Sequence, residues 1–381
     1  MTANTTDVNI LVQEEHLAAN GLHSLVTHSF HEHDVSDGIH ATVHMLSSKV
    51  DSGLKKAVPG LERLTVDHHA GNYVVVRETG ERIFEAMPMY VRIGMHMLFH
   101  GKEQMKLLET RRMENILREQ SIRQGKHYDS HESVKNIPSF VAAYKIQLGE
   151  LLEPDLSKYP NFNEFFYRKL KPGARPVHDD EDPLVICSPA DCRLAVYPTM
   201  DLAKKFWVKG RHFDIPNLLG LNPADELVQQ FSNASLAIAR LAPADYHRFH
   251  SPIDGTLGEI VNIPGQYYTV NPLAVNEVGF DVFTANTRSI LYIKHKATGL
   301  PVAFVAIGAL LVGSIKWTKG AEKGSEIKRG DEVGYFAYGG STIVVVMPPG
   351  VVQLDQDLVV NSQLPMETIV KVGSHIGKTP Q

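Results

Sequence analysis

Hydrophobic and polar residues follow different patterns before and after about residue 160. Between Lys102 and Gln124, apolar residues recur every three or four positions among charged ones, which predicts a helix that ends near Gly125. Residues 139–152 are expected to form a second helix. After Pro160, short apolar or β-branched runs alternate with turns rich in Pro and Gly, as is typical of strands. The clearest of these runs cover residues 236–241, 290–295, 302–307 and 342–347.

This change of pattern predicts an α+β fold, with a helical N-terminal region followed by a β-rich catalytic domain of sandwich or barrel type. We expect a polar, histidine-rich arm over residues 1–75, a helical region over 76–158 and the β-rich domain over 159–381. Within the helical region, Met87 to Phe99 is apolar and rich in methionine but too short to cross a bilayer. It is a candidate membrane-facing helix, and packing as a core helix is the alternative.

Composition narrows the class of protein. Of the 381 residues, 43% are hydrophobic and 21% charged, which is typical of a globular protein. The net charge of -5 gives no support for a nucleic-acid partner. The two cysteines, Cys187 and Cys192, exclude a disulfide scaffold and fit a reducing compartment. Without a secretory signal or an apolar run of ~18 residues, the protein is expected to be cytoplasmic or peripheral on an internal membrane, neither secreted nor transmembrane.

Three short segments of the β-rich part carry residues suited to chemistry. Asp191 ends a Ser-Pro-Ala-Asp segment, His247 and His250 lie in Tyr-His-Arg-Phe-His, and Ser314 follows Gly313 after an apolar run. Asp, His and Ser are the parts of a nucleophilic triad, but this serine is not in a Gly-x-Ser-x-Gly elbow. A serine directly after glycine can attack the glycine carbonyl, and the resulting ester breaks by elimination. Loss of ammonia then leaves a pyruvoyl group, an electron sink comparable to pyridoxal phosphate.

These segments, in this order, resemble the phosphatidylserine decarboxylases, a pyruvoyl-dependent family. Cys192 and Ile315 stand where many members have glycine and threonine. Upstream, residues 122–126 and 128–130 resemble the eukaryotic type that in some members carries C2 domains, of which this chain would be a short form. The matching segments are residues 162–176 (the opening segment), 188–191, 246–250, 312–314 (the processing site) and 339–342 (a glycine-rich loop).

The resemblance implies a role for each matching residue. Ser314 would become the pyruvoyl cofactor, and the cut before it would give a β chain, 1–313, and an α chain, 314–381. His250 would activate Ser314, Asp191 would orient His250, and His247 would serve as proton donor in decarboxylation. The loop residues Gly339, Gly340, Ser341 and Thr342 are candidates for contacting the substrate. No metal is expected.

The resemblance also implies partners. The substrate would be phosphatidylserine in a membrane, which forms a Schiff base and yields phosphatidylethanolamine and CO2; a homo-oligomer is compatible with this. One alternative is a pyruvoyl-dependent decarboxylase of a free, for example aromatic, amino acid. Another is a zinc hydrolase that uses His247, His250 and Asp191. A third is a carrier domain of the lipoyl type, with Lys316 or Lys319 as its attachment site.

Overall fold

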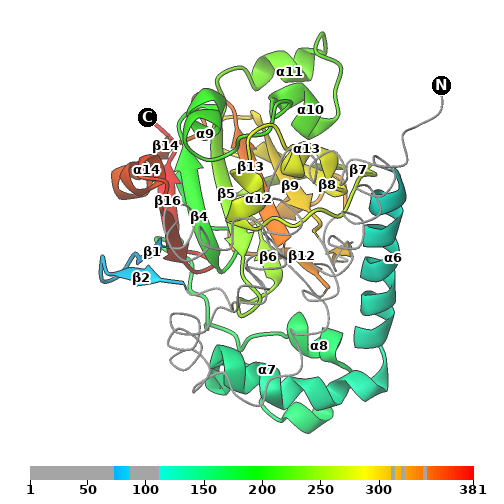
Figure 1. Cartoon of the computed structure of the whole chain (residues 1–381). Coiled ribbons are helices and arrows are strands. Elements are labelled where there is room, and N and C mark those ends of the chain that lie inside the picture. The colour runs from blue at the N-terminus through cyan, green and yellow to red at the C-terminus, as the bar shows by residue number, and fades with distance from the viewer. Residues whose placement is uncertain (1–72, 86–110, 310–313, 319–321, 338–340) are drawn as a thin grey trace, which may run out of the picture.

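A ten-stranded sheet forms the centre of the protein in the computed structural model, which describes residues 73–85, 111–309, 314–318, 322–337 and 341–381 (Figure 1). Its strand order is β11-β7-β8-β9-β13-β5-β4-β15-β1-β2. All neighbours are antiparallel except β1 and β15. The strands are β1 (Tyr73–Val76), β2 (Arg82–Phe84), β4 (Cys192–Tyr197), β5 (Ser235–Leu241), β7 (Gly255–Ile263), β8 (Arg288–His295), β9 (Pro301–Ile307), β11 (Glu326–Ile327), β13 (Ser341–Met347) and β15 (Glu367–Val370).

Strand β13 shows why the central strands read as unbroken apolar runs. Successive side chains of a strand point to opposite faces of the sheet. Ile343, Val345 and Met347 pack into one buried cluster, and Val344 and Val346 pack into another. Both faces of the sheet are therefore covered, and every position of the strand is buried.

One face of the sheet is covered by two small sheets and a helix. The small sheets have the orders β10-β12-β6 and β14-β16-β3. Phe249 and Phe336 of the first small sheet and Ile376 of the second pack against the main sheet together with Leu358 of α14. The elements on this face are β3 (Val185–Cys187), β6 (Arg248–His250), β10 (Ile315–Trp317), β12 (Glu332–Phe336), β14 (Gln353–Leu354), β16 (His375–Lys378) and α14 (Gln356–Gln363).

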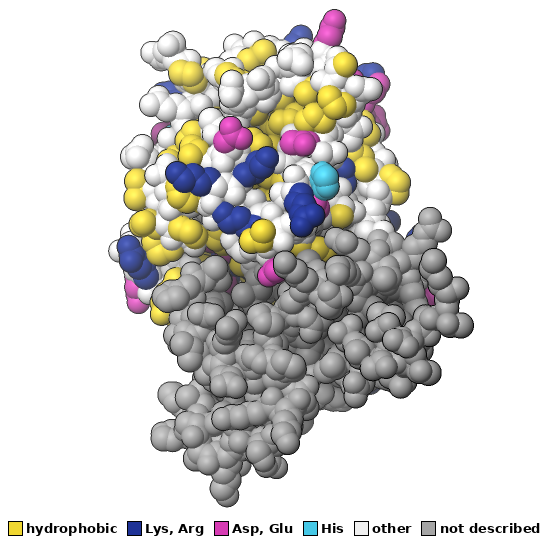
Figure 2. Space-filling model, turned by 45° about the horizontal axis from the view of Figure 1, so that its top comes forward, with side chains coloured by type: hydrophobic (Ala, Val, Ile, Leu, Met, Phe, Trp, Pro, Cys, Tyr) yellow, Lys and Arg dark blue, Asp and Glu magenta, His cyan; other side chains and the backbone are white. Residues whose placement is uncertain are grey.

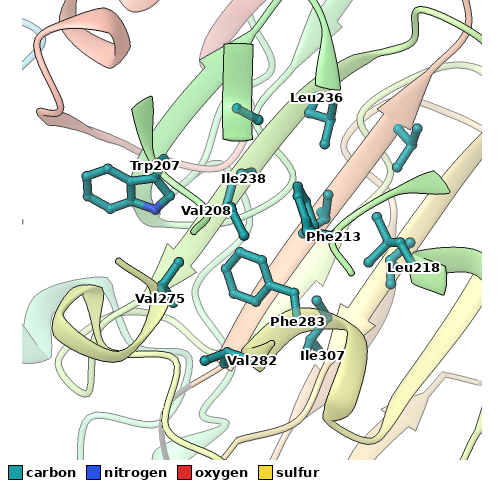
Figure 3. Close-up of a cluster of buried hydrophobic side chains, with 14 of the residues drawn as sticks. Trp207, Val208, Phe213, Leu218, Leu236, Ile238, Val275, Val282, Phe283 and Ile307 are labelled. Atoms are coloured by element: carbon teal, nitrogen blue, oxygen red, sulfur yellow. The ribbon is translucent and has the colours of Figure 1, made fainter. Parts of the chain in front are cut away.

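Short helices and their loops cover the other face. In Figure 3, Trp207, Phe213 and Phe283 lie over the strands that carry Ile238 and Ile307, and all five side chains are buried. These helices are short because Pro, Gly and Asx residues end or cap them; for example, the Asp214 side chain accepts a hydrogen bond from Asn217 N at the start of α10. They are α9 (Met200–Phe206), α10 (Ile215–Leu219), α11 (Glu226–Gln230), α12 (Pro272–Val275) and α13 (Val282–Ala285).

The remaining helices form a third, aromatic cluster beside the sheet (Figure 1). Tyr128, Phe140, Phe162, Phe165 and Phe166 are all buried in it. The rings of Phe140 and Phe162 meet edge to face, with centroids 5.1 Å apart, which is a favourable geometry for an aromatic pair. The contributing elements are α6 (Arg111–Tyr128), η2 (His131–Asn136), α7 (Ile137–Tyr144), η3 (Leu148–Glu150), η4 (Leu156–Lys158) and α8 (Phe162–Phe166).

The structure confirms the α+β class and the order of helical and β-rich regions. The main sheet is open, because β11 and β2 are its two ends in the part of the chain that the structure describes; it is not a barrel. The four predicted strands are present as β5, β8, β9 and β13. Helix α6 continues past the expected stop at Gly125 to Tyr128.

Two sequence predictions concern residues near the N-terminus. The expected boundary at residue 75 falls within β1, which pairs with β15 and so belongs to the main sheet. The apolar Met87 to Phe99 segment lies outside the described residues. Among the helices that the structure describes, none is long and apolar enough to cross a bilayer.

Both cysteines, Cys187 and Cys192, are buried free thiols.

Candidate active site

Residues 246–250, called the histidine segment below, meet the start of β13 at one end of the sheet. Ser341, the first residue of β13, is paired with Leu241, the last residue of β5. The chain then turns through residues 242–247 into β6, and Phe336 N of β12 donates a hydrogen bond to His247 O over 3.0 Å. In β6, Phe249 points into the core, so its neighbours Arg248 and His250 lie on the opposite side of the strand.

His247 is fully buried and its imidazole has one defined tautomer. Nε2 lies 3.0 Å from Ala242 O, and Nδ1 lies 3.4 Å from Ser341 Oγ. A carbonyl oxygen can only accept a hydrogen bond, so Nε2 of His247 carries the ring proton. Nδ1 is unprotonated and accepts a hydrogen bond from the Ser341 hydroxyl. Burial, reinforced by the nearby Arg168 guanidinium, lowers the pKa of His247 to about 3. The imidazole is therefore neutral at neutral pH, with its unprotonated nitrogen facing residue 341.

His250 lies in an adjacent cleft of about 280 Å³. Its Nδ1 donates to Gly330 O over 2.8 Å, and Nε2 lies 3.3 Å from the Tyr246 hydroxyl. Burial lowers the pKa of His250, so this imidazole is also neutral at neutral pH. The cleft is lined by Lys169, Leu170, Lys171, Gly173, Arg175, Tyr246, His250 and Glu332.

Asp191 is bound by an arginine that no chemical pattern in the sequence marked as functional. Arg175 donates from Nε to Oδ1 over 2.8 Å and from the Nη2 amino group to Oδ2 over 2.6 Å, and Val372 N donates to Oδ1 over 2.9 Å. The described contacts of Asp191 do not include His250. The two residues are connected through Arg175, which lines the same cleft as His250. Arg175 belongs to the opening segment, residues 162–176. Its place in a segment that resembles the family was the one indication of a functional role in the sequence.

The two candidate serines differ sharply in their surroundings. Ser314 is exposed, and its carbonyl accepts a hydrogen bond from Ala337 N over 3.1 Å. Ser341 is fully buried with its hydroxyl at the His247 imidazole. Thr342 is also fully buried, and its hydroxyl has no hydrogen-bond partner among the described residues. Gly313, Gly339 and Gly340 lie outside the described residues. The structure thus brings a histidine to Ser341 and leaves the Ser314 side chain at the surface.

Comparison with known proteins places this arrangement in a family. The sequence profile described as phosphatidylserine decarboxylase matches residues 162–378, more than half of the chain. The chain belongs to the phosphatidylserine decarboxylase family. The matched range includes the opening segment, Asp191, both histidines and both serines.

Members of the family from fungi, plants and bacteria are similar to this chain. Phosphatidylserine decarboxylase proenzyme 2 of Komagataella phaffii is 43% identical over 305 residues, 80% of this chain and 29% of that protein. Proenzyme 2 of Oryza sativa subsp. japonica is 43% identical over 303 residues, 79% of this chain and 47% of that protein. The proenzyme of Fusobacterium nucleatum is 38% identical over 253 residues, 66% of this chain and 81% of that protein. The chain therefore spans less than half the length of its fungal and plant relatives.

The geometry does not favour the zinc or the carrier alternative. The nitrogens of His247 and His250 that do not bind a backbone carbonyl face the hydroxyls of Ser341 and Tyr246. The Asp191 carboxylate is bound by Arg175. In the part of the chain that the structure describes, no three His, Cys, Asp or Glu side chains are grouped to hold a metal ion. Lys316 is the middle residue of strand β10, opposite Tyr335, whereas a carrier lysine sits at a hairpin tip. Lys319 lies outside the described residues.

Proposed function

We propose that this protein is a self-processing decarboxylase that removes the carboxyl group of phosphatidylserine as CO2, using a pyruvoyl group made from one of its own serines. Family membership and the names of the relatives support the substrate and the proenzyme character. The observation that carries the proposal is the contact between Ser341 Oγ and His247 Nδ1 inside the core. A serine directly after glycine is suited to this conversion. The neutral imidazole beside it is suited to proton transfer at residue 341 in the decarboxylation.

Ser341, rather than the predicted Ser314, is the serine that we propose for this conversion. Its burial would shield a reactive carbonyl from water, whereas Ser314 is exposed. Gly339 and Gly340 precede Ser341 in the sequence and offer no side chain to obstruct attack on the Gly340 carbonyl. A cut between Gly340 and Ser341 would give chains of residues 1–340 and 341–381 in place of 1–313 and 314–381.

The pyruvoyl group, once formed, supplies the electron sink for decarboxylation. His247 is the residue that we propose for handling protons there, because its Nδ1 faces residue 341. A neutral imidazole can first take a proton from the ammonium group of the substrate. It can later return a proton to the carbon that has lost CO2, which refines the predicted role of a simple proton donor.

His250 and Asp191 keep the role that the resemblance implies, which is to promote the chain cut. Their support is a shared environment: His250 and Arg175 line one cleft, and Arg175 binds Asp191 through two hydrogen-bonded nitrogens. Arg175 is accordingly the residue that would hold Asp191 in place. The ion pair is largely shielded from solvent, since the two side chains are 11% and 10% exposed.

The intact mass of the purified protein under denaturing, reducing conditions tests the self-processing. We expect two chains, the smaller being residues 341–381, with 41 residues and no free amino terminus. Its mass should be lower, by one ammonia, than that of the peptide with an N-terminal serine. A 68-residue small chain would restore Ser314 as the processed residue. A single uncut chain would contradict self-processing altogether.

The substrate needs its own assay. On the described face in Figure 2, Lys and Arg side chains lie beside hydrophobic ones, with Asp and Glu side chains near them. The support for phosphatidylserine as the substrate is therefore family membership. We expect CO2 release from phosphatidylserine vesicles and none from free serine or free aromatic amino acids. Release from a free amino acid alone would instead establish the alternative substrate class.

A further inference from the structure

The turn between β5 and the histidine segment, residues 242–245, is closed by the side chain of Asp245. Asp245 Oδ2 accepts a hydrogen bond from Ala242 N over 2.7 Å, and Asp245 N donates to Ala242 O over 2.9 Å. Ala242 O is also the acceptor for His247 Nε2, at 3.0 Å. Asp245 is therefore two hydrogen bonds away from the imidazole that faces Ser341.

Two arginines from distant segments fasten this turn. Arg193 of β4 donates from its Nη1 amino group to both Asp245 carboxylate oxygens, over 2.6 and 2.5 Å. Arg168 of the opening segment donates to Ala244 O over 2.9 Å and to Asp245 O over 3.3 Å. Arg168 thus binds the backbone of the turn, and Arg193 binds its carboxylate. A side-chain change at Asp245 leaves the Arg168 contacts available, so the turn keeps one of its two anchors.

Glu85 completes the group from the segment that follows β2. Arg193 Nε donates to Glu85 Oε1 over 2.8 Å, and Glu85 also forms an ion pair with Arg240 of β5. Arg193 lies directly opposite Arg240 in the sheet, so Glu85 separates two like charges. The side chains of Arg193 and Asp245 are only 11% and 15% exposed. An ion pair this shielded from water is costly to break from one side.

We propose that Asp245, oriented by Arg193, is a positioning residue that sets the tautomer of His247. It does so by fixing Ala242, whose carbonyl requires a proton on Nε2 and so leaves Nδ1 free toward residue 341. The proposal rests on the proposed function for its consequence in turnover. Without the carboxylate, the contact with Arg193 is lost and the Ala242 carbonyl is held by Asp245 N alone. The carbonyl is then less firmly fixed against Nε2, and the imidazole can carry its proton on either nitrogen.

Steady-state kinetics on phosphatidylserine vesicles test the consequence. Asp245→Asn should lower kcat by roughly 10- to 100-fold, the range typical of losing a partner that orients a metal-ligating histidine, with KM changed by less than about twofold. The matched control is Glu367→Gln, which breaks the neighbouring Arg240–Glu367 ion pair without touching the turn. The control should lower the melting temperature to a similar degree and leave kcat unchanged. Equal kcat values for the two variants would reduce Asp245 to a structural role.

A second readout does not depend on activity. In the uncut Ser341→Ala precursor, the ¹⁵N shifts of the His247 ring should report a proton on Nε2, the signal being assigned by its loss in His247→Gln. Adding Asp245→Asn should mix the two tautomers, and adding Glu367→Gln should not. A pure Nε2 tautomer in the Asp245→Asn protein would overturn the proposal even if the enzyme proved to have another substrate. Should Asp245→Asn fail to fold, Arg193→Lys takes its place in both experiments, because lysine keeps the charge but cannot bind Asp245 and Glu85 through separate nitrogens.

Discussion

The imidazole of His247 lies against the ring of Phe166, with centroids 4.0 Å apart and planes inclined by 32°. Phe166 ends helix α8 and belongs to the aromatic cluster beside the sheet. One side of the candidate active site is therefore formed by the aromatic cluster, to which the opening segment contributes Phe162, Phe165 and Phe166. This contact helps to exclude water from His247. The resulting burial lowers the pKa of the imidazole, which therefore remains neutral.

Replacing Phe166 by alanine should lower the stability of the protein. Loss of a fully buried phenylalanine typically costs about 3–5 kcal/mol in the free energy of unfolding, because it leaves a cavity. Urea denaturation of the uncut Ser341→Ala precursor, with and without Phe166→Ala, measures this. Val278→Ala serves as the comparison, since that side chain is 81% exposed and its loss should change stability by less than about 0.5 kcal/mol.

The two serines give a direct comparison of the cut. Ser341→Ala should yield one uncut, inactive chain, because the proposed nucleophile is gone. Ser314→Ala should be cut normally, because this side chain is exposed and the described contacts bring no histidine to it. Denaturing gel electrophoresis and intact mass read both variants. The reverse result, with only Ser314→Ala uncut, would move the processed residue back to Ser314.

The two histidines should separate cleavage from turnover. His247→Ala is expected to be cut yet to release no CO2 from phosphatidylserine, because no group remains to move protons at residue 341. His250→Ala and Asp191→Asn are expected to be cut slowly. Time courses of chain cleavage, followed by activity of the matured protein, measure the two steps. An uncut His247→Ala protein would show that His247, not His250, activates the serine.

Acid should destabilise the protein partly through His247. The native pKa is about 3, whereas an unfolded histidine titrates near 6.5, so protons bind the unfolded chain first as the pH falls. The stabilisation is complete above pH 6.5 and is lost as the pH falls toward 3, by about 2 kcal/mol at pH 5. In the uncut Ser341→Ala precursor, adding His247→Gln should flatten the loss of stability between pH 7 and 5. The exposed His212→Gln is the control, and an identical slope with and without the His247 substitution would contradict the assignment.

Much of the fold follows from local pattern. Strands β5, β8, β9 and β13 were predictable because each is a continuous apolar run bounded by turns, and such runs need both faces covered. The pairing of β1 with β15 was not, because it joins Val74 to Glu367 across nearly 300 residues and neither strand's pattern names its partner. The sequence also could not predict that the main sheet is open. A sheet closes into a barrel only if the strands at its two ends, here β11 and β2, pair with each other, and no local pattern decides this.

The candidate site was only partly predictable for a similar reason. Asp191, His247 and His250 stand in distinctive segments, so their residue types alone suggested chemistry. Gly313–Ser314 and Gly340–Ser341 are both glycine–serine pairs next to apolar runs, and the sequence offers no local measure that separates them. What separates them is burial beside an imidazole, and this depends on the register that pairs Ser341 with Leu241. Arg175 was missed because its importance lies in its partner, Asp191.

The strand order has a consequence for the cut protein. After residue 341, the chain contributes β13, which lies between β5 and β9, and β15, which lies between β4 and β1. A break before Ser341 would leave two polypeptides interleaved in one sheet, each supplying neighbours that the other lacks. Their association would then be inseparable from folding, so the pair would withstand dilution as a single chain does. The precursor's continuous backbone would act as an assembly aid that becomes dispensable once the sheet has formed.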